Sequence, residues 1–199
     1  MANTSRVNGF KTVKHLNGSP YNGQATMYQV NAADATALFV GDMVCLDLPI
    51  APTTDLNNSP VGLRAIQRGI ISTPLVGAIV GFKVTPTDLN APQQYRAAST
   101  LRYAMVADSP DLIFECEANQ TTTATLVGVN CEVSVAAGST ATGNSGMTAD
   151  MTLTGTTNTS PLKIMEIVQR PDNVVGTYNK ILVKINNHSN GSLGNVGAS

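Results

Sequence analysis

Alternation of apolar and polar residues with a period of two is the main pattern in this chain, and it is clearest in the second half. Over residues 112–117, one side carries Leu112, Phe114 and Cys116, and the other carries Ile113, Glu115 and Glu117. Residues 181–185 repeat the pattern with Ile181, Val183 and Ile185 on one side. Because successive side chains of a strand point to opposite faces, the pattern predicts half-buried antiparallel strands.

A longer apolar face is predicted from Val127 to Val135, with the residues between its members directed outward. The inward set is Val127, Val129, Cys131, Val133 and Val135, and the outward set is Gly128, Asn130, Glu132 and Ser134. Further strands are expected within residues 38–46, 61–68, 76–84, 101–106 and 162–168, separated by loops at 49–60, 85–98 and 138–150. No stretch longer than ten residues has an apolar face at helical spacing. The chain is therefore predicted to be all-β, an antiparallel barrel or sandwich with an extended N-terminal arm and little helix.

The two ends of the chain lack this periodicity. Residues 1–25 are predicted to form an extended arm, residues 26–188 the all-β body, and residues 189–199 a flexible tail. The arm is expected to dock on a neighbouring protein surface through its cations and aromatic rings, or to pack on its own body. The candidate contact residues are Arg6, Phe10, Lys11, Lys14 and Tyr21. Deletion of residues 1–24 is expected to leave a folded, soluble protein that no longer binds that surface.

Low charge is the main feature of the composition. Charged residues make up 13% and hydrophobic residues 42%, and the formal net charge is −1. A surface covered by neutral polar residues suits contact with other proteins, whereas the lack of any cluster of five or more Lys and Arg residues argues against a nucleic-acid ligand. The first residues have no apolar core of signal-peptide type, and no apolar stretch approaches membrane-spanning length. We therefore expect synthesis in a cytoplasm and no membrane partner.

Candidate catalytic chemistry is sparse, and we expect no enzyme activity, no cofactor and no metal site. The cysteines Cys45, Cys116 and Cys131 are far apart and have apolar neighbours, which is typical of small buried side chains. The glycine-rich residues 138–145 have phosphate-loop spacing, but an asparagine stands where the lysine is needed. His15 and His188 fall in the arm and at the tail. The acids Asp108, Asp111, Glu115 and Glu117 are interpreted as a solvated strand face, with a carboxylate hydrolase as the alternative.

Four long stretches resemble virion structural proteins of tailed bacteriophages. They are SRVNGFKTVKHLNGSPYNG (5–23), QYRAASTLRYAMVAD (94–108), VQRPDN (168–173) and LVKINNH (182–188). The family looks like the head cement or decoration proteins, which sit on the capsid lattice and clamp neighbouring capsomers. The resemblance implies a non-enzymatic protein on the outer surface of the phage head, with the major capsid protein as its partner.

The same resemblance implies a homo-oligomer that follows the local symmetry of the shell, with a homotrimer preferred over a homodimer. One alternative is a carbohydrate-binding module displayed on a virion, which would need exposed aromatic residues on one face. Aromatic residues make up only 5% of the chain and tryptophan is absent. The other alternative is the small β-fold hydrolase.

Overall fold

The computed structural model describes residues 3–47, 63–84, 90 and 92–191. These residues contain thirteen strands and one short 3₁₀ helix, η1 (Ala124–Leu126), so the all-β prediction is confirmed. The strands form two large antiparallel sheets and a small two-stranded sheet, in a sandwich-like arrangement. The predicted loop at 49–60 and residues 192–199 of the predicted tail lie outside the described residues.

The first sheet, sheet A, has six strands. In spatial order they are β1 (Lys11–His15), β9 (Leu112–Glu117), β13 (Lys180–Ile185), β12 (Leu162–Ile167), β10 (Asn130–Ser134) and β11 (Thr148–Gly155). Just beyond β9, the Asn119 N–H donates to the Ala149 carbonyl of β11 at 3.0 Å. The bond connects the end of β9, the second strand in the order, with β11, the last strand. Sheet A therefore curls toward a closed barrel.

The second sheet, sheet B, has five strands and curls in the same way. Its order is β2 (Thr26–Val30), β8 (Arg102–Ala107), β6 (Gly77–Phe82), β4 (Met43–Leu46) and β5 (Ile66–Arg68). The Gln29 N–H of β2 donates to the Arg64 carbonyl, just before β5, at 3.0 Å. Beside sheet B, β3 (Leu38–Phe39) pairs with β7 (Tyr95–Arg96).

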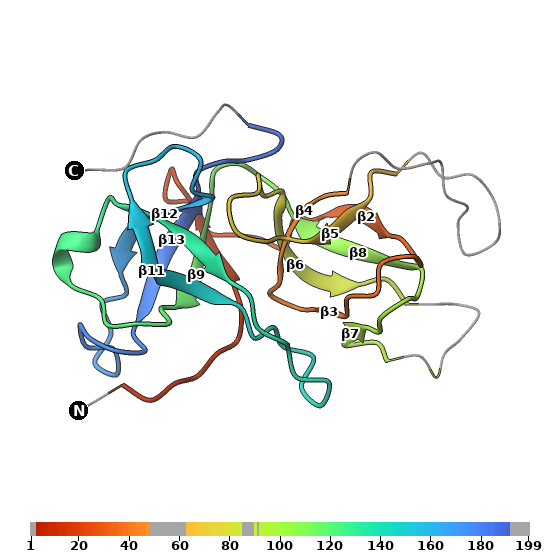
Figure 1. Cartoon of the computed structure of the whole chain (residues 1–199), viewed down its shortest axis with the longest axis horizontal. Helices are drawn as coiled ribbons and strands as arrows, with labels where there is room; N and C mark the ends of the chain where they lie inside the picture. Colours follow the sequence, from red (N-terminus) through yellow and green to blue (C-terminus); the bar gives the residue numbers. More distant parts are fainter. Residues whose placement is uncertain (1–2, 48–62, 85–89, 91, 192–199) are drawn as a thin grey trace.

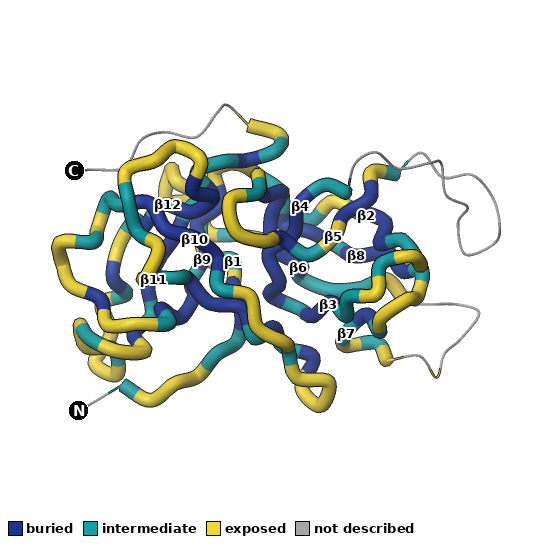
Figure 2. The backbone as a smooth tube through the Cα atoms, in the orientation of Figure 1, coloured by how far each residue is buried: buried dark blue, intermediate teal, exposed yellow. Residues whose placement is uncertain are grey.

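Each sheet encloses buried apolar side chains, and the two sheets lie side by side (Figure 1, Figure 2). Tyr28, Val44 and Ile79 belong to the core of sheet B, whereas the core of sheet A extends to Met43 and Ala78 of sheet B. The sheets therefore share apolar contacts. Between β6 and the end of β8 the backbones approach so closely that a Cβ on Gly77 would lie 2.0 Å from the Ala107 oxygen. Only glycine fits there.

The strands predicted at 112–117 and 181–185 are confirmed, but the predicted apolar face from Val127 to Val135 is wrong at its ends. The strand is limited to β10, and Val127 and Val135 are 42% and 37% exposed. Before β10 the chain leaves η1 and turns at Gly128, whose φ is 89°. Glu132, expected to point to solvent, is only 6% exposed because a turn from the other half of the molecule covers it.

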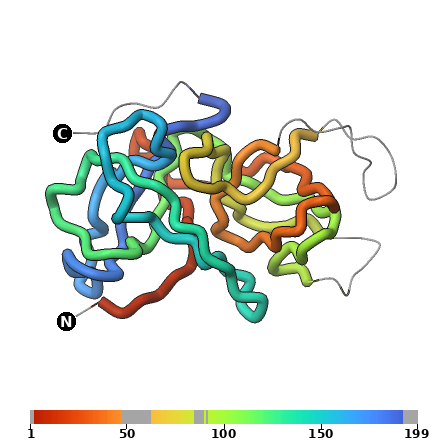
Figure 3. The backbone as a smooth tube through the Cα atoms, in the orientation of Figure 1, coloured from red at the N-terminus to blue at the C-terminus, as the bar shows by residue number. Residues whose placement is uncertain are grey.

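The N-terminal segment, defined as residues 3–25, lies along its own body (Figure 3). Within it, β1 pairs with β9, and Phe10 is 2% exposed in the core of sheet A. The outer edge of β1 is covered where the Tyr21 N–H donates to the Val13 carbonyl at 3.3 Å. Deletion of residues 1–24 would remove a strand and a core ring, so the structure argues against the expectation that the body folds without them.

Candidate functional site

The five predicted contact residues differ in how accessible they are. Arg6 and Lys11 are exposed, and Lys14 and Tyr21 are half-buried. Phe10 is a core residue of this chain, which corrects its assignment as a docking anchor. Aromatic rings in segments without periodicity indicate burial somewhere, but the sequence alone does not say in which molecule. Arg6, Lys11, Lys14 and Tyr21, which all keep accessible surface, therefore remain the candidates for contact with a partner.

Glu117 fixes the N-terminal segment to sheet A. Its side chain is 2% exposed, and its carboxylate accepts hydrogen bonds from the Ser5 hydroxyl at 2.7 Å and the Arg6 N–H at 2.6 Å. Lys180 of β13 completes the arrangement with an ion pair of 3.1 Å. The expectation that Glu117 lies on a solvated strand face is wrong, because residues 5 and 6 cover it. A buried carboxylate needs such partners, since an unpaired charge in the interior is strongly destabilising.

Asn3 fastens the start of the same segment to the loop between β12 and β13. Its side-chain amide donates to the Val174 and Thr177 carbonyls at 2.7 and 2.9 Å, and its oxygen accepts from the Val174 N–H at 3.0 Å. Residues 3–6 are thus held at Asn3 and again at Glu117. The segment has a defined position, and the side chains between the two attachments project from fixed backbone.

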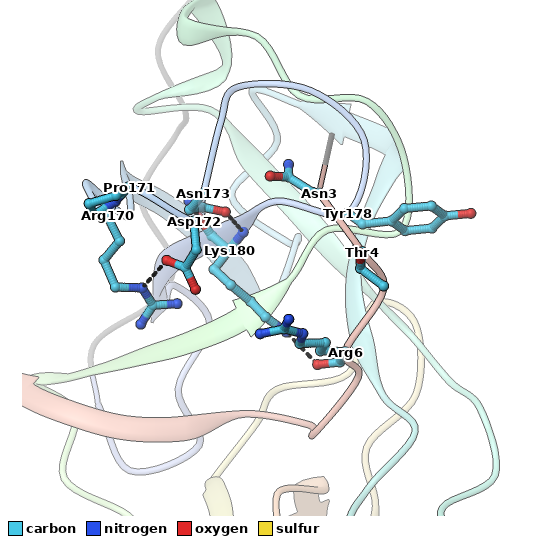
Figure 4. Close-up of a pocket in the computed structure, with 9 residues that line it drawn as sticks. All are labelled: Asn3, Thr4, Arg6, Arg170, Pro171, Asp172, Asn173, Tyr178 and Lys180. Carbon is cyan, nitrogen blue, oxygen red and sulfur yellow. Dashed lines mark hydrogen bonds and ion pairs between the residues drawn. The ribbon is translucent and has the colours of Figure 1, made fainter. Parts of the chain in front are cut away.

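A cavity of about 360 Å³ lies between residues 3–6 and the loop before β13 (Figure 4). Its lining residues are Asn3, Thr4, Arg6, Arg170, Pro171, Asp172, Asn173, Tyr178 and Lys180. Three of them are cations and one is an acid. Arg170 binds Glu115 through two 3.1 Å hydrogen bonds and Asp172 at 3.5 Å.

A second exposed feature is the apolar turn, defined as Ile70–Thr73, which precedes β6. Ile70 and Ile71 are 55% and 51% exposed. Ser72 has a φ of 59°, a conformation that is unfavourable for residues other than glycine, and its N–H donates to Glu132 of sheet A at 2.8 Å. A buried carboxylate thus holds the turn while it presents two isoleucines to solvent.

A hollow of about 320 Å³ adjoins the apolar turn, lined among others by Ile71 and Leu153 of β11. Leu153 is 46% exposed. This surface was not predicted from the sequence. The sequence does contain a sign of it, the adjacent isoleucines Ile70 and Ile71 between Gly69 and Pro74. Two consecutive side chains in a turn cannot both point into the same core.

The four acids considered for hydrolysis do not converge on one site. Asp108 accepts a 2.7 Å hydrogen bond from the Tyr28 hydroxyl, Asp111 is exposed, and Glu115 and Glu117 pair with different cations. Among the described residues, no group of three or more His, Cys, Asp and Glu side chains is arranged to hold a metal ion. A carboxylate pair in one pocket, which hydrolysis requires, is therefore not formed by these residues.

The remaining candidates are explained by packing. All three cysteines are buried, as predicted, and burial raises the pKa of the Cys116 and Cys131 thiols. In the glycine-rich loop, a Cβ on Gly138 would lie 2.3 Å from the Phe39 ring, so this glycine serves close packing. His188, expected at the tail, is 6% exposed, and burial lowers its pKa.

Comparison with protein-family models, with curated proteins and with solved structures finds no match for this chain. None of the described residues belongs to a helix with the length and apolar character that crossing a membrane demands.

Proposed function

We propose that this chain is a non-enzymatic cement protein of a bacteriophage head, which binds the major capsid protein on the outer surface of the shell and stabilises it. The proposal combines the resemblance of four stretches to virion structural proteins with an exterior that has little charge. Many copies, each bridging several subunits, add small contacts into a large stabilisation of the shell. Self-association around a symmetry axis of the shell is part of the proposal.

The observation that carries the proposal is the apolar turn. Two adjacent isoleucines are more than half exposed, and the turn that bears them is fixed by Glu132 in an unfavourable conformation at Ser72. Strained backbone of this kind is found where function requires a fixed geometry. A surface that is already ordered loses little conformational entropy on association, so the apolar turn and the adjacent hollow form a favourable protein contact.

The two alternatives lack the groups they need. In the described part of the chain, Tyr178, at 42% exposure, is the only large aromatic residue among the exposed hydrophobic ones, so a cluster of rings for stacking on sugars is missing. A hydrolase would need paired carboxylates in a pocket, and Asp108, Glu115 and Glu117 are each engaged separately.

Binding to heads tests the proposal directly. Purified protein is mixed with phage heads that lack it, bound copies per head are counted by imaging, and the heads are then heated with and without it. We expect saturable occupancy at fixed lattice positions and release of DNA at a higher temperature. Heads that bind no protein would refute the proposed function.

A double variant, Ile70→Ser with Ile71→Ser, tests the role of the apolar turn. The control is Val84→Ser, because Val84 is 54% exposed and lies after β6, away from the turn. We expect the double variant to remain folded but to bind heads at least about tenfold more weakly, which corresponds to the loss of one or two apolar contacts. The control should bind like the unsubstituted protein. Equal binding by both variants would remove the apolar turn from the interface.

A further inference from the structure

The cavity between the N-terminal segment and the loop before β13 is lined by three cations, and two of them have an acidic partner. Lys180 is engaged by Glu117, and Arg170 by Glu115 and Asp172. Among the residues that the structure describes, no hydrogen bond or ion pair engages the Arg6 guanidinium. A guanidinium offers a planar fork of donors that matches the two oxygens of a carboxylate.

The backbone of Arg6 is fixed on both sides. Its N–H donates to Glu117 at 2.6 Å, and its carbonyl accepts a hydrogen bond of 2.5 Å from the Lys180 ammonium. Figure 4 shows Arg6 and Lys180 close together at one side of the cavity, with Tyr178 and Thr4 at another. The side chain of Arg6 therefore starts from a defined position at the cavity, which lowers the entropy lost when it binds a ligand.

The charges around the cavity favour a ligand with a single negative charge. The lining carries three cations and one acid, Asp172, so its own formal charge is positive. Glu115 and Glu117 lie just behind two of these cations and neutralise part of their charge. The three carboxylates repel a doubly charged phosphate more strongly than a singly charged carboxylate, which the Arg6 guanidinium and the hydroxyl groups nearby can bind.

We infer that this cavity binds a carboxylate side chain of the partner polypeptide, with Arg6 as the residue that holds it. The partner is the capsid subunit, so this identity rests on the proposed function, whereas the carboxylate site itself is independent of it. The N-terminal segment then has two roles, since its buried residues stabilise sheet A and its exposed guanidinium binds the partner.

Acetate is the probe for the site in isolation. In a titration followed by NMR, we expect saturable shifts of the backbone amide signals of residues 3–6 and 172–180, beyond those caused by chloride at equal ionic strength. Arg6→Ala should abolish the saturable part, and the control Lys83→Ala, at an exposed cation just after β6, should not. Shifts equal to those of chloride, or an unchanged titration in Arg6→Ala, would overturn the site. Tighter binding of inorganic phosphate than of acetate would overturn its selectivity.

Binding to heads tests the partner. We expect Arg6→Ala to bind about tenfold more weakly, Arg6→Lys to be intermediate because an ammonium cannot form the paired hydrogen bonds, and Lys83→Ala to be unchanged. Equal binding by Arg6→Ala and the unsubstituted protein would refute the assignment of the partner. If the unsubstituted protein does not bind heads, the proposed function fails, and the acetate titration still decides the carboxylate site. Thermal unfolding of each variant confirms that the fold is retained.

Discussion

Substitution of the buried acid Asp42 should make the protein more stable at neutral pH. Asp42 is 0% exposed, between β3 and β4, and its carboxylate accepts a 2.9 Å hydrogen bond from the Phe39 N–H. Burial raises the pKa of Asp42 from 3.8 to about 6, although the Ser145 hydroxyl, the Phe39 N–H and the charge of Arg68 each act to lower it. The ionised form is therefore unfavourable in the folded protein.

The size and sign of the effect follow from proton linkage. With a pKa of about 6 in the folded protein and 3.8 in the unfolded chain, the difference corresponds to about 3 kcal/mol. A raised pKa contributes stability that is fully present below pH 4 and is lost as the pH rises through 6. Asp42→Asn is neutral at every pH and keeps an oxygen for the Phe39 N–H. Its advantage over the unsubstituted protein should thus grow from near zero at pH 4 to about 3 kcal/mol above pH 7.

Urea unfolding followed by circular dichroism measures this difference, since the chain has no tryptophan for fluorescence. Between pH 4 and 8, the separation of the urea midpoints should increase by about 1 to 3 M. Because the pKa of His188 is lowered in the folded protein, this residue makes the fold more stable as the pH rises. The effect is the same in both proteins, so it does not change the difference between them. The exposed Asp111 provides a control, because Asp111→Asn removes the same charge at a position that is not buried. A separation that is constant with pH would refute the reasoning.

Three further predictions concern stability. Phe10→Ala should lower the free energy of unfolding by about 3 to 5 kcal/mol, the usual loss for a buried ring, in urea titrations. Gly77→Ala should abolish soluble folded protein or shift the midpoint strongly, because the added Cβ meets the Ala107 carbonyl; an unchanged midpoint would contradict the close approach. The thiols of Cys116 and Cys131 should react with a thiol reagent only as fast as the protein unfolds, whereas rapid labelling without urea would show that they are accessible.

The strands were predictable from alternation, although the side of each residue was not always right. Residues 181–185 alternate in sequence, and Ile181, Val183 and Ile185 are buried as the pattern predicts, but Leu182, expected to point outward, is also buried at 8% exposure. The alternation fails where a segment distant in sequence covers the second face. Glu117 is buried by residues 5 and 6, and Glu132 by the turn at Ser72, and no local pattern reports such contacts.

The candidate site was less accessible to sequence reasoning than the fold. Arg6 was singled out because cations in an unpatterned segment suggested contact, yet its position depends on Asn3, Glu117 and Lys180, which come from three separate parts of the chain. Arg96 was not identified at all. Its side chain is fully buried and donates to the carbonyls of Asn31 and Thr100, which a charged residue in a short strand does not reveal.

The closure of both sheets has a consequence for a protein proposed to crowd in many copies on one shell. Unpaired strand edges at high local concentration invite neighbouring chains to pair backbone to backbone, which leads to aggregation. Here the Gln29–Arg64 and Asn119–Ala149 hydrogen bonds join strands across the open side of each sheet, and residues 19–21 shield the outer side of β1. At these edges, closely packed copies would therefore contact one another through side chains and not through backbone pairing.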